Sequence, residues 1–109
     1  MALTEKLLGQ SNPGAVLTTL YQLPASTRAI VKGMWVCNTG LSNQTFRIYV
    51  DPTGTSYIAS KSIYYEVPIA PGETRTMDDF LALNTPGGSI GVYASSTDVV
   101  FTASGAEIT

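Results

Sequence analysis

The sequence predicts a small all-β protein, a single antiparallel β-sandwich of about eight strands that is jelly-roll-like or immunoglobulin-like. Three observations support this prediction. Short runs of β-branched and aromatic residues are separated by clusters of Gly, Pro, Asn, Asp and Ser about every 8–12 residues. Amphipathic helical periodicity is nearly absent. The chain has 109 residues, which is enough for one two-layer core and no more.

The first two strands of the body are predicted at residues 15–23 and 28–38, because turn-forming residues follow each run. In the second run, Trp35 lies on the same alternating face as Val31 and Cys37, so all three are predicted in the core. Cys37 is the only cysteine, which excludes an internal disulfide and favours a small buried hydrophobe over a reactive thiol.

The next strand is predicted at residues 44–50, where apolar and polar residues alternate. Phe46, Ile48 and Val50 share one face, which we expect to lie on the core. The Asp-Pro-Thr-Gly sequence at 51–54 then predicts a turn.

Residues 55–62 are predicted to form a loop with a single helical turn, followed by a strand at 63–69. The adjacent Tyr64 and Tyr65 of that strand must point to opposite faces. We therefore expect one ring in the core and the other at the surface.

A turn is predicted at residues 70–72 and a short polar strand at 73–77. Thr76 and Asp79 have the spacing of a capping box, which predicts a brief helical turn or bend before Phe80.

The last two strands are predicted at residues 89–94 and 98–108, after a turn at 84–88. The short link at 95–97 suggests that they form a closing hairpin. Their matching apolar faces would carry Ile90, Val92 and Ala94 on one strand and Val99, Phe101 and Ala103 on the other.

Residues 1–14 are predicted to be an N-terminal arm or an edge strand, and residues 15–109 the sandwich domain. Leu3, Leu7 and Leu8 form an apolar cluster ahead of a Ser-Asn-Pro-Gly break. We expect these three leucines to bind a partner if the segment is an arm, and to pack on their own domain if it is an edge strand.

Charge is sparse, at 13% of residues with a net charge of −2, which favours an assembly component and a homo-oligomer, with a trimer as the working model. The six basic residues are scattered singly, so nucleic acid is not an expected partner. No apolar stretch is long enough to span a bilayer and no signal peptide is recognisable, so synthesis and folding in the cytosol are expected.

Catalytic and cofactor sites are not expected. The sequence has no histidine and one cysteine, which excludes the usual metal sites and nucleophilic triads. Glu66, Glu73, Asp78 and Asp79 are the carboxylates closest in sequence, but a small domain offers little cleft for paired acids, and the last two lack the spacing of a calcium loop. A sugar-binding platform remains open for the exposed members of one aromatic set: Trp35, Tyr49, Tyr57, Tyr64 and Tyr65.

Residues 7–108 resemble small accessory structural proteins of tailed bacteriophages. The elements that carry this resemblance are LGQ, LYQLPA, VCN and TFRIYV in the first half, and IYYEVPIAPGET and IGVYASSTDVVFTASGAEI in the second. The resemblance implies a β-sandwich in the virion and defines no functional residues. The expected function is capsid decoration or cementing between shell subunits, with the major capsid protein or other virion proteins as partners. A tail, baseplate or fibre component and a carbohydrate-binding module for host attachment are the alternatives.

Overall fold

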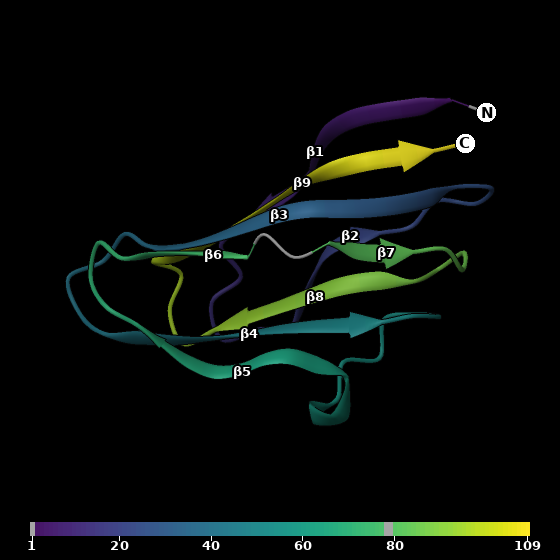
Figure 1. Cartoon of the computed structure of the whole chain (residues 1–109). Coiled ribbons are helices and arrows are strands. Elements are labelled where there is room, and N and C mark those ends of the chain that lie inside the picture. Colours follow the sequence, from purple (N-terminus) through teal and green to yellow (C-terminus); the bar gives the residue numbers. More distant parts are fainter. Residues whose placement is uncertain (1, 78–79) are drawn as a thin grey trace.

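A computed structural model describes residues 2–77 and 80–109, which form nine strands and one short 3-10 helix (Figure 1). The elements are β1 Leu3–Ser11, β2 Thr18–Gln22, β3 Arg28–Asn38, β4 Gln44–Asp51, η1 Ala59–Lys61, β5 Ser62–Ile69, β6 Thr74–Met77, β7 Leu81–Leu83, β8 Ser89–Ala94 and β9 Val99–Ile108. The all-β prediction is confirmed.

The strands form two antiparallel sheets that pack face to face (Figure 1). The five-stranded sheet has the order β1-β9-β3-β6, with β7 also paired to β3, and the four-stranded sheet has the order β2-β8-β4-β5. The pairs are nested, since the first strand pairs with the last, the second with the next to last, and β4 with β5. Nested antiparallel pairs divided between two sheets are the arrangement of a jelly roll, so the topology selects this alternative over the immunoglobulin type.

The predicted closing hairpin of β8 and β9 is wrong. β8 pairs with β2 and β4, whereas β9 pairs with β1 and β3 in the other sheet. Alternation identifies the face that a strand buries, but it does not identify the strand's neighbour. The apolar faces of the two strands both belong to the core, to which they contribute from opposite sheets.

The core lies between the sheets and is fully buried at its centre. Phe46 of β4 and Phe101 of β9 are both 0% exposed, with ring centroids 6.0 Å apart in an edge-to-face arrangement. Ile48 is 0% exposed, as predicted. Val50 is partly buried and packs against this core.

A bulge in β3 overturns the prediction that Trp35 and Cys37 share the buried face of Val31. Val31 pairs with Gly105 and Gly33 pairs with Ser104, so Lys32 is an extra residue. An extra residue reverses the alternation beyond it. Val31 is therefore 0% exposed, whereas Trp35 is 42% exposed and Cys37 is half-buried on the outer face.

The same bulge brings two backbones very close together. A β-carbon added to Gly105 would lie 2.0 Å from the carbonyl oxygen of Ile30, on the neighbouring strand. The contact distance excludes any side chain at this position of β9.

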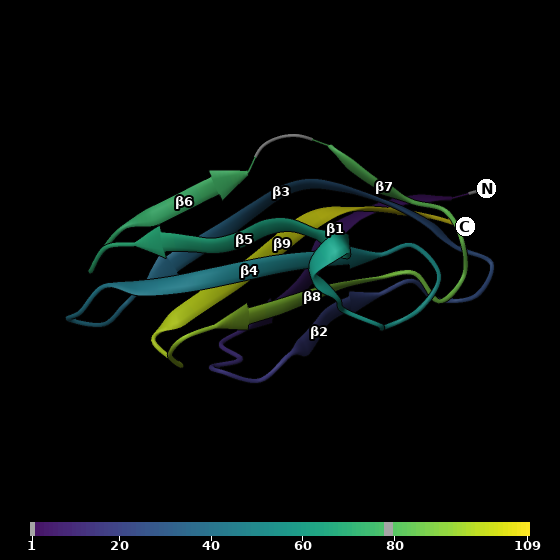
Figure 2. The same ribbon diagram turned by 90° about the horizontal axis from the view of Figure 1, so that it is seen from below.

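The loop between β4 and β5 folds back over the outer side of the four-stranded sheet, as Figure 2 shows from below. Its short helix η1 and the strand that follows confirm the helical turn and strand predicted there. The Tyr57 ring lies against Gly91 of β8, where an added β-carbon would be 2.6 Å from ring atoms, and its centroid is 6.0 Å from that of Tyr49. Tyr49 is consequently only 2% exposed, although it is on the outer face.

Asp51 anchors this loop from a buried position. Its carboxylate accepts hydrogen bonds from the backbone N–H groups of Thr53, at 3.0 Å, and Ser56, at 2.7 Å, and lies 3.1 Å from the Lys61 amine. The two backbone bonds, followed by the ammonium group, lower the pKa of Asp51 to about 2.

The helical turn or bend predicted before Phe80 falls mainly on residues outside the described part of the chain. Thr76 belongs to β6 and Leu81 begins β7. Asp79, the second member of the predicted capping box, lies outside the described residues.

The N-terminal segment is an edge strand in the structure. β1 pairs along β9 from Leu3 to Ser11, with a bulge at Leu8, which packs against the core. Ala2 and Thr109 exchange backbone hydrogen bonds of 2.9 Å, so the two ends of the described chain lie side by side (Figure 1).

Candidate interaction surfaces

The outer face of the five-stranded sheet carries an apolar surface built from its three longest strands. The register joins its members, because Leu3 is opposite Ile108 and Leu7 is opposite Ser104, which is opposite Gly33. The Trp35 ring lies over Gly33, where an added β-carbon would be 3.4 Å from the ring. We call this surface the outer patch; it consists of Leu3, Leu7, Ile30, Trp35 and Ile108.

Three members of the outer patch are exposed, and its two isoleucines are partly buried. The charged residues Arg28, which is opposite Ile108, and Lys32 and Glu5 lie on the same face. Leu3 is 63% exposed, Leu7 56% and Trp35 42%. Glu5, which lies between the two leucines on the same face, is paired with Lys32 of the β3 bulge at 3.1 Å. The ion pair neutralises charge at the centre of the patch, so the surface suits a partner with an apolar face.

The three leucines predicted to bind a partner do not share one face. Leu3 and Leu7 project from the outer face of β1, whereas the bulge turns Leu8 to the opposite face, against the core. The part of the prediction that remains open to test therefore rests on Leu3 and Leu7.

The outer face of the four-stranded sheet carries a stacked cluster of Tyr65, Arg47 and Tyr93. The Arg47 guanidinium carbon lies 4.6 Å from the Tyr65 ring centroid and 4.4 Å from that of Tyr93, which are cation–π distances. A bulge in β5 places Tyr65 and Glu66 opposite the single residue Arg47, and the Glu66 carboxylate pairs with the guanidinium. Arg47 thus occupies ring faces that a sugar would need.

The paired tyrosines of β5 divide as predicted. Tyr64 packs against the core, and Tyr65 is 49% exposed.

A hydrogen bond links the two sheets at β2 and β9. The Tyr21 hydroxyl donates to one oxygen of the Glu107 carboxylate, and Lys6 donates to the other at 3.1 Å. These two donors, Tyr21 first, lower the pKa of Glu107. Burial, together with the adjacent carboxylate, raises the pKa of Tyr21.

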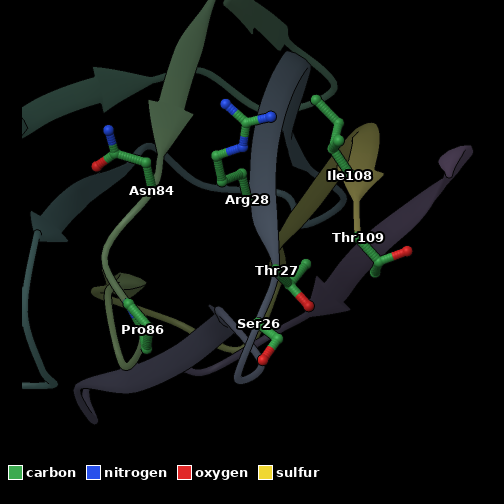
Figure 3. Close-up of a pocket in the computed structure, with 7 residues that line it drawn as sticks. All are labelled: Ser26, Thr27, Arg28, Asn84, Pro86, Ile108 and Thr109. Carbon is green, nitrogen blue, oxygen red and sulfur yellow. The ribbon is translucent and has the colours of Figure 1, made fainter. Parts of the chain in front are cut away.

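One open pocket of about 350 Å³ lies at the end of the sandwich where β3 begins and β9 ends. Figure 3 shows Asn84 and Pro86 on one side, Ile108 and Thr109 on the other, and the segment that includes Arg28 between them. Arg28 is the only charged residue among those that line it, and no carboxylate, cysteine or histidine is present in the lining. The pocket therefore brings together no nucleophile and base.

The carboxylates singled out in the sequence are dispersed. Glu66 pairs with Arg47, whereas Glu73 accepts a hydrogen bond from the backbone of Ala70 at 2.8 Å and pairs with Arg75 at 3.2 Å. Asp78 and Asp79 lie outside the described residues. Within residues 2–77 and 80–109, no three potential ligands of the His, Cys, Asp or Glu types are grouped around a metal-sized space. No described helix has the length and hydrophobicity to cross a membrane.

Trp35 is the surface residue that sequence reasoning missed. Its exposure depends on the bulge at Lys32, and the sequence signal for that bulge is weak: a Lys-Gly pair inside an otherwise apolar run.

No family model and no curated protein matches this chain. Among solved structures, it is similar to a chain in the infectious bursal disease virus Gx strain, with a TM-score of 0.55 and 14% identity over 97% of this chain. It is also similar to chains of the T13 particle of that virus, with a TM-score of 0.55 and 13% identity, and of its VP2 subviral particle, with a TM-score of 0.54 and 14% identity, again over 97% of this chain. The chain spans 30–31% of the length of these three chains. At this identity the likeness shows the fold alone.

Proposed function

We propose that this chain is a non-enzymatic structural protein of a virus particle, which decorates or cements the capsid of a tailed bacteriophage by binding between shell subunits. Its partner is the major capsid protein, and its location is the virion. The observation that carries the proposal is the outer patch, a set of apolar side chains on the outer face of the five-stranded sheet, of which Leu3, Leu7 and Trp35 are exposed.

Two further points support the proposal. The jelly roll is a fold that viral capsid proteins use, and three of the structural neighbours come from virus particles. Lectins and cupins use the fold as well, so the fold supports the proposal by analogy and the exposed surface supports it by chemistry. A cementing protein needs a surface that buries apolar area against the shell, and it needs no reacting groups.

A tail, baseplate or fibre component would use the same surface and is the second candidate. The outer patch does not distinguish between capsid and tail partners.

A carbohydrate-binding role has less support. The most exposed tyrosine of the four-stranded sheet, Tyr65, already stacks on Arg47, and Tyr49 is covered by Tyr57. Ring faces that are occupied within the chain are not available to a sugar.

The test is a binding experiment with shells that lack this protein. Purified chain is mixed with such shells and sedimented, and bound copies are then located by electron microscopy. We expect saturable binding at sites between subunits. Binding to tails alone would favour the second candidate, and absence of binding to shells and tails would overturn the proposal.

Matched leucine variants test the surface. Leu3→Ser combined with Leu7→Ser should weaken shell binding at least about tenfold, because docking would bury the exposed part of two leucine side chains, and full burial of one such side chain contributes roughly 1.5–3 kcal/mol. Leu41→Ser is the control, since Leu41 is a leucine that is 98% exposed in a loop outside the patch. Equal binding by both variants would exclude the outer patch.

A further inference from the structure

β1 forms one edge of the five-stranded sheet, and no other described strand pairs with its outer side. Ala2 and Thr109 exchange backbone hydrogen bonds, so they form a hydrogen-bonded pair of the β1–β9 ladder. Such pairs alternate with non-hydrogen-bonded pairs along an antiparallel ladder. Leu3, Glu5 and Leu7 therefore direct their N–H and C=O groups away from β9, toward the edge of the sheet.

We propose that this edge pairs with the same edge of a second copy, antiparallel and centred on Glu5. The outward-directed residues are symmetric about that centre, because Leu3 and Leu7 each lie two positions from Glu5. A twofold axis at Glu5 places Leu3 beside Leu7 of the second copy and Glu5 beside Glu5. The three resulting pairs exchange about six backbone hydrogen bonds.

The side chains fit this arrangement. Leu3 and Leu7 are 63% and 56% exposed on the same face, so each covers its counterpart from the second copy. The two central glutamates would repel each other, but each is paired with Lys32 of its own chain at 3.1 Å. The centre of the interface is thus a row of four charges with no net charge.

The edge lacks several features that protect an exposed strand. It is nine residues long and contains no proline, and its outward residues are two leucines and one neutralised glutamate. Protected edges are usually short, or they carry proline, charge or a bulge. The bulge of β1 lies at Leu8, beyond the three outward-directed residues, and the charge of Glu5 is paired. A second copy is favoured over an unrelated extended segment because the symmetry of Leu3, Glu5 and Leu7 has no role in binding an asymmetric partner.

The contact is smaller than a standard interface, so the dimer is expected to be weak and concentration-dependent. Pairing also joins the outer patches of the two copies into one face. The inference goes beyond the proposed attachment to a shell and does not depend on it.

The first test is sedimentation equilibrium of the full chain over a range of concentrations. We expect a reversible monomer–dimer equilibrium. Glu5→Pro removes one outward N–H and leaves the ladder to β9 intact, so it should weaken the dimer at least about tenfold with little loss of melting temperature. Glu5→Gln is the matched control, which keeps the N–H and should dimerise at least as well as the original chain.

If the Glu5→Pro variant does not fold, Leu3→Glu provides a second test of the dimer. It places a charge beside Leu7 of the second copy and should weaken the dimer, whereas Leu41→Glu at an exposed loop position should not.

Cross-linking tests the centre of symmetry. With Cys37→Ser, the variant Glu5→Cys should form a disulfide-linked dimer, because residues in a hydrogen-bonded pair have α-carbons about 5.5 Å apart, which is within disulfide range. Thr4→Cys and Lys6→Cys should cross-link poorly alone and well when mixed.

A monomer at all concentrations, a trimer, or a dimer that is unaffected by both Glu5→Pro and Leu3→Glu would overturn the inference. Shell binding is measured separately. A monomer that binds shells contradicts only this inference, and a dimer that does not bind them contradicts only the proposed function.

Discussion

The Tyr21 hydroxyl donates a hydrogen bond of 2.5 Å to the Glu107 carboxylate, and this bond connects β2 of one sheet to β9 of the other. Tyr21 is 8% exposed, so its hydroxyl has little access to water. The bond therefore satisfies a buried donor and an acceptor from opposite layers of the sandwich, in addition to the apolar contacts of the core.

Tyr21→Phe should lower the free energy of unfolding by about 1 kcal/mol, because the carboxylate loses one of its two side-chain donors. The pKa of Glu107 is lowered in the folded protein, so this contribution is present at neutral pH and is lost as the pH falls through the folded-state pKa. Urea unfolding at neutral and acidic pH measures the effect. The difference from the original chain should shrink in acid, and a constant difference would contradict the assigned role of Glu107.

Asp51 should control the acid stability of the loop that covers the four-stranded sheet. The pKa of Asp51 is about 2 in the folded protein and 3.8 without these contacts. The ionised carboxylate therefore stabilises the folded protein fully above about pH 4, and this contribution is lost as the pH falls toward 2. Asp51→Asn should lower the melting temperature at pH 7 by several degrees and remove part of the decrease between pH 4 and 2. Asp98→Asn, at an exposed position, is the control. If the melting temperatures of the Asp51 variant and of the original chain depend on pH in the same way, the prediction is contradicted.

Gly105→Ala should be severely destabilising. The added methyl group would overlap the Ile30 carbonyl oxygen, and relief requires the two central strands to separate at the bulge. We expect a loss of more than about 3 kcal/mol or failure to fold, measured by thermal melting followed by circular dichroism. Gly54→Ala is the control, because its nearest contact would be an ordinary 3.5 Å, and it should change stability by less than about 0.5 kcal/mol. Similar melting of the two variants would show that β3 and β9 are farther apart than described.

Trp35 is the only tryptophan, so its fluorescence reports on the outer patch. In the isolated chain, its 42% exposure should allow quenching by acrylamide. Docking of a shell on the patch should protect the ring and shift its emission to shorter wavelength. Dimerisation through β1 should change the signal little, because β9 separates β1 from the strand that carries Trp35. Unchanged quenching on saturated shells would show that the contact lies elsewhere.

The sequence predicted correctly those features of the fold that depend only on residues close together in the chain. The alternation around Phe46 and Ile48 identified the buried face of β4, and the turn residues placed most strand ends within a few positions. Both patterns are local in the sequence, so they can be recognised without knowing which strands are neighbours in the sheet.

The remaining features required long-range information. The exposure of Trp35 depends on one extra residue, Lys32, opposite a strand about seventy positions away in the chain, and no local pattern reports such a mismatch. The placement of β8 and β9 in different sheets is also a long-range feature, because it depends on how all the other strands pair. Of the outer patch, the sequence singled out Leu3 and Leu7, whose binding role stays a prediction. It did not single out the other three members, Ile30, Trp35 and Ile108.

The nested order of the strands has a consequence for how the chain folds. Among the strands that the structure describes, β4 and β5 are the one pair of consecutive strands that hydrogen-bond to each other. Each of the other described ladders joins strands that are farther apart in the chain. Folding dominated by such distant pairings is slow, because loop-closure entropy is lost before the contacts form. During synthesis on the ribosome, β1 emerges before β9 and cannot pair with it until β9 has also emerged. β1, with its exposed Leu3 and Leu7, therefore has no partner strand while the rest of the sandwich is made, and it can be bound by chaperones or aggregate during that time.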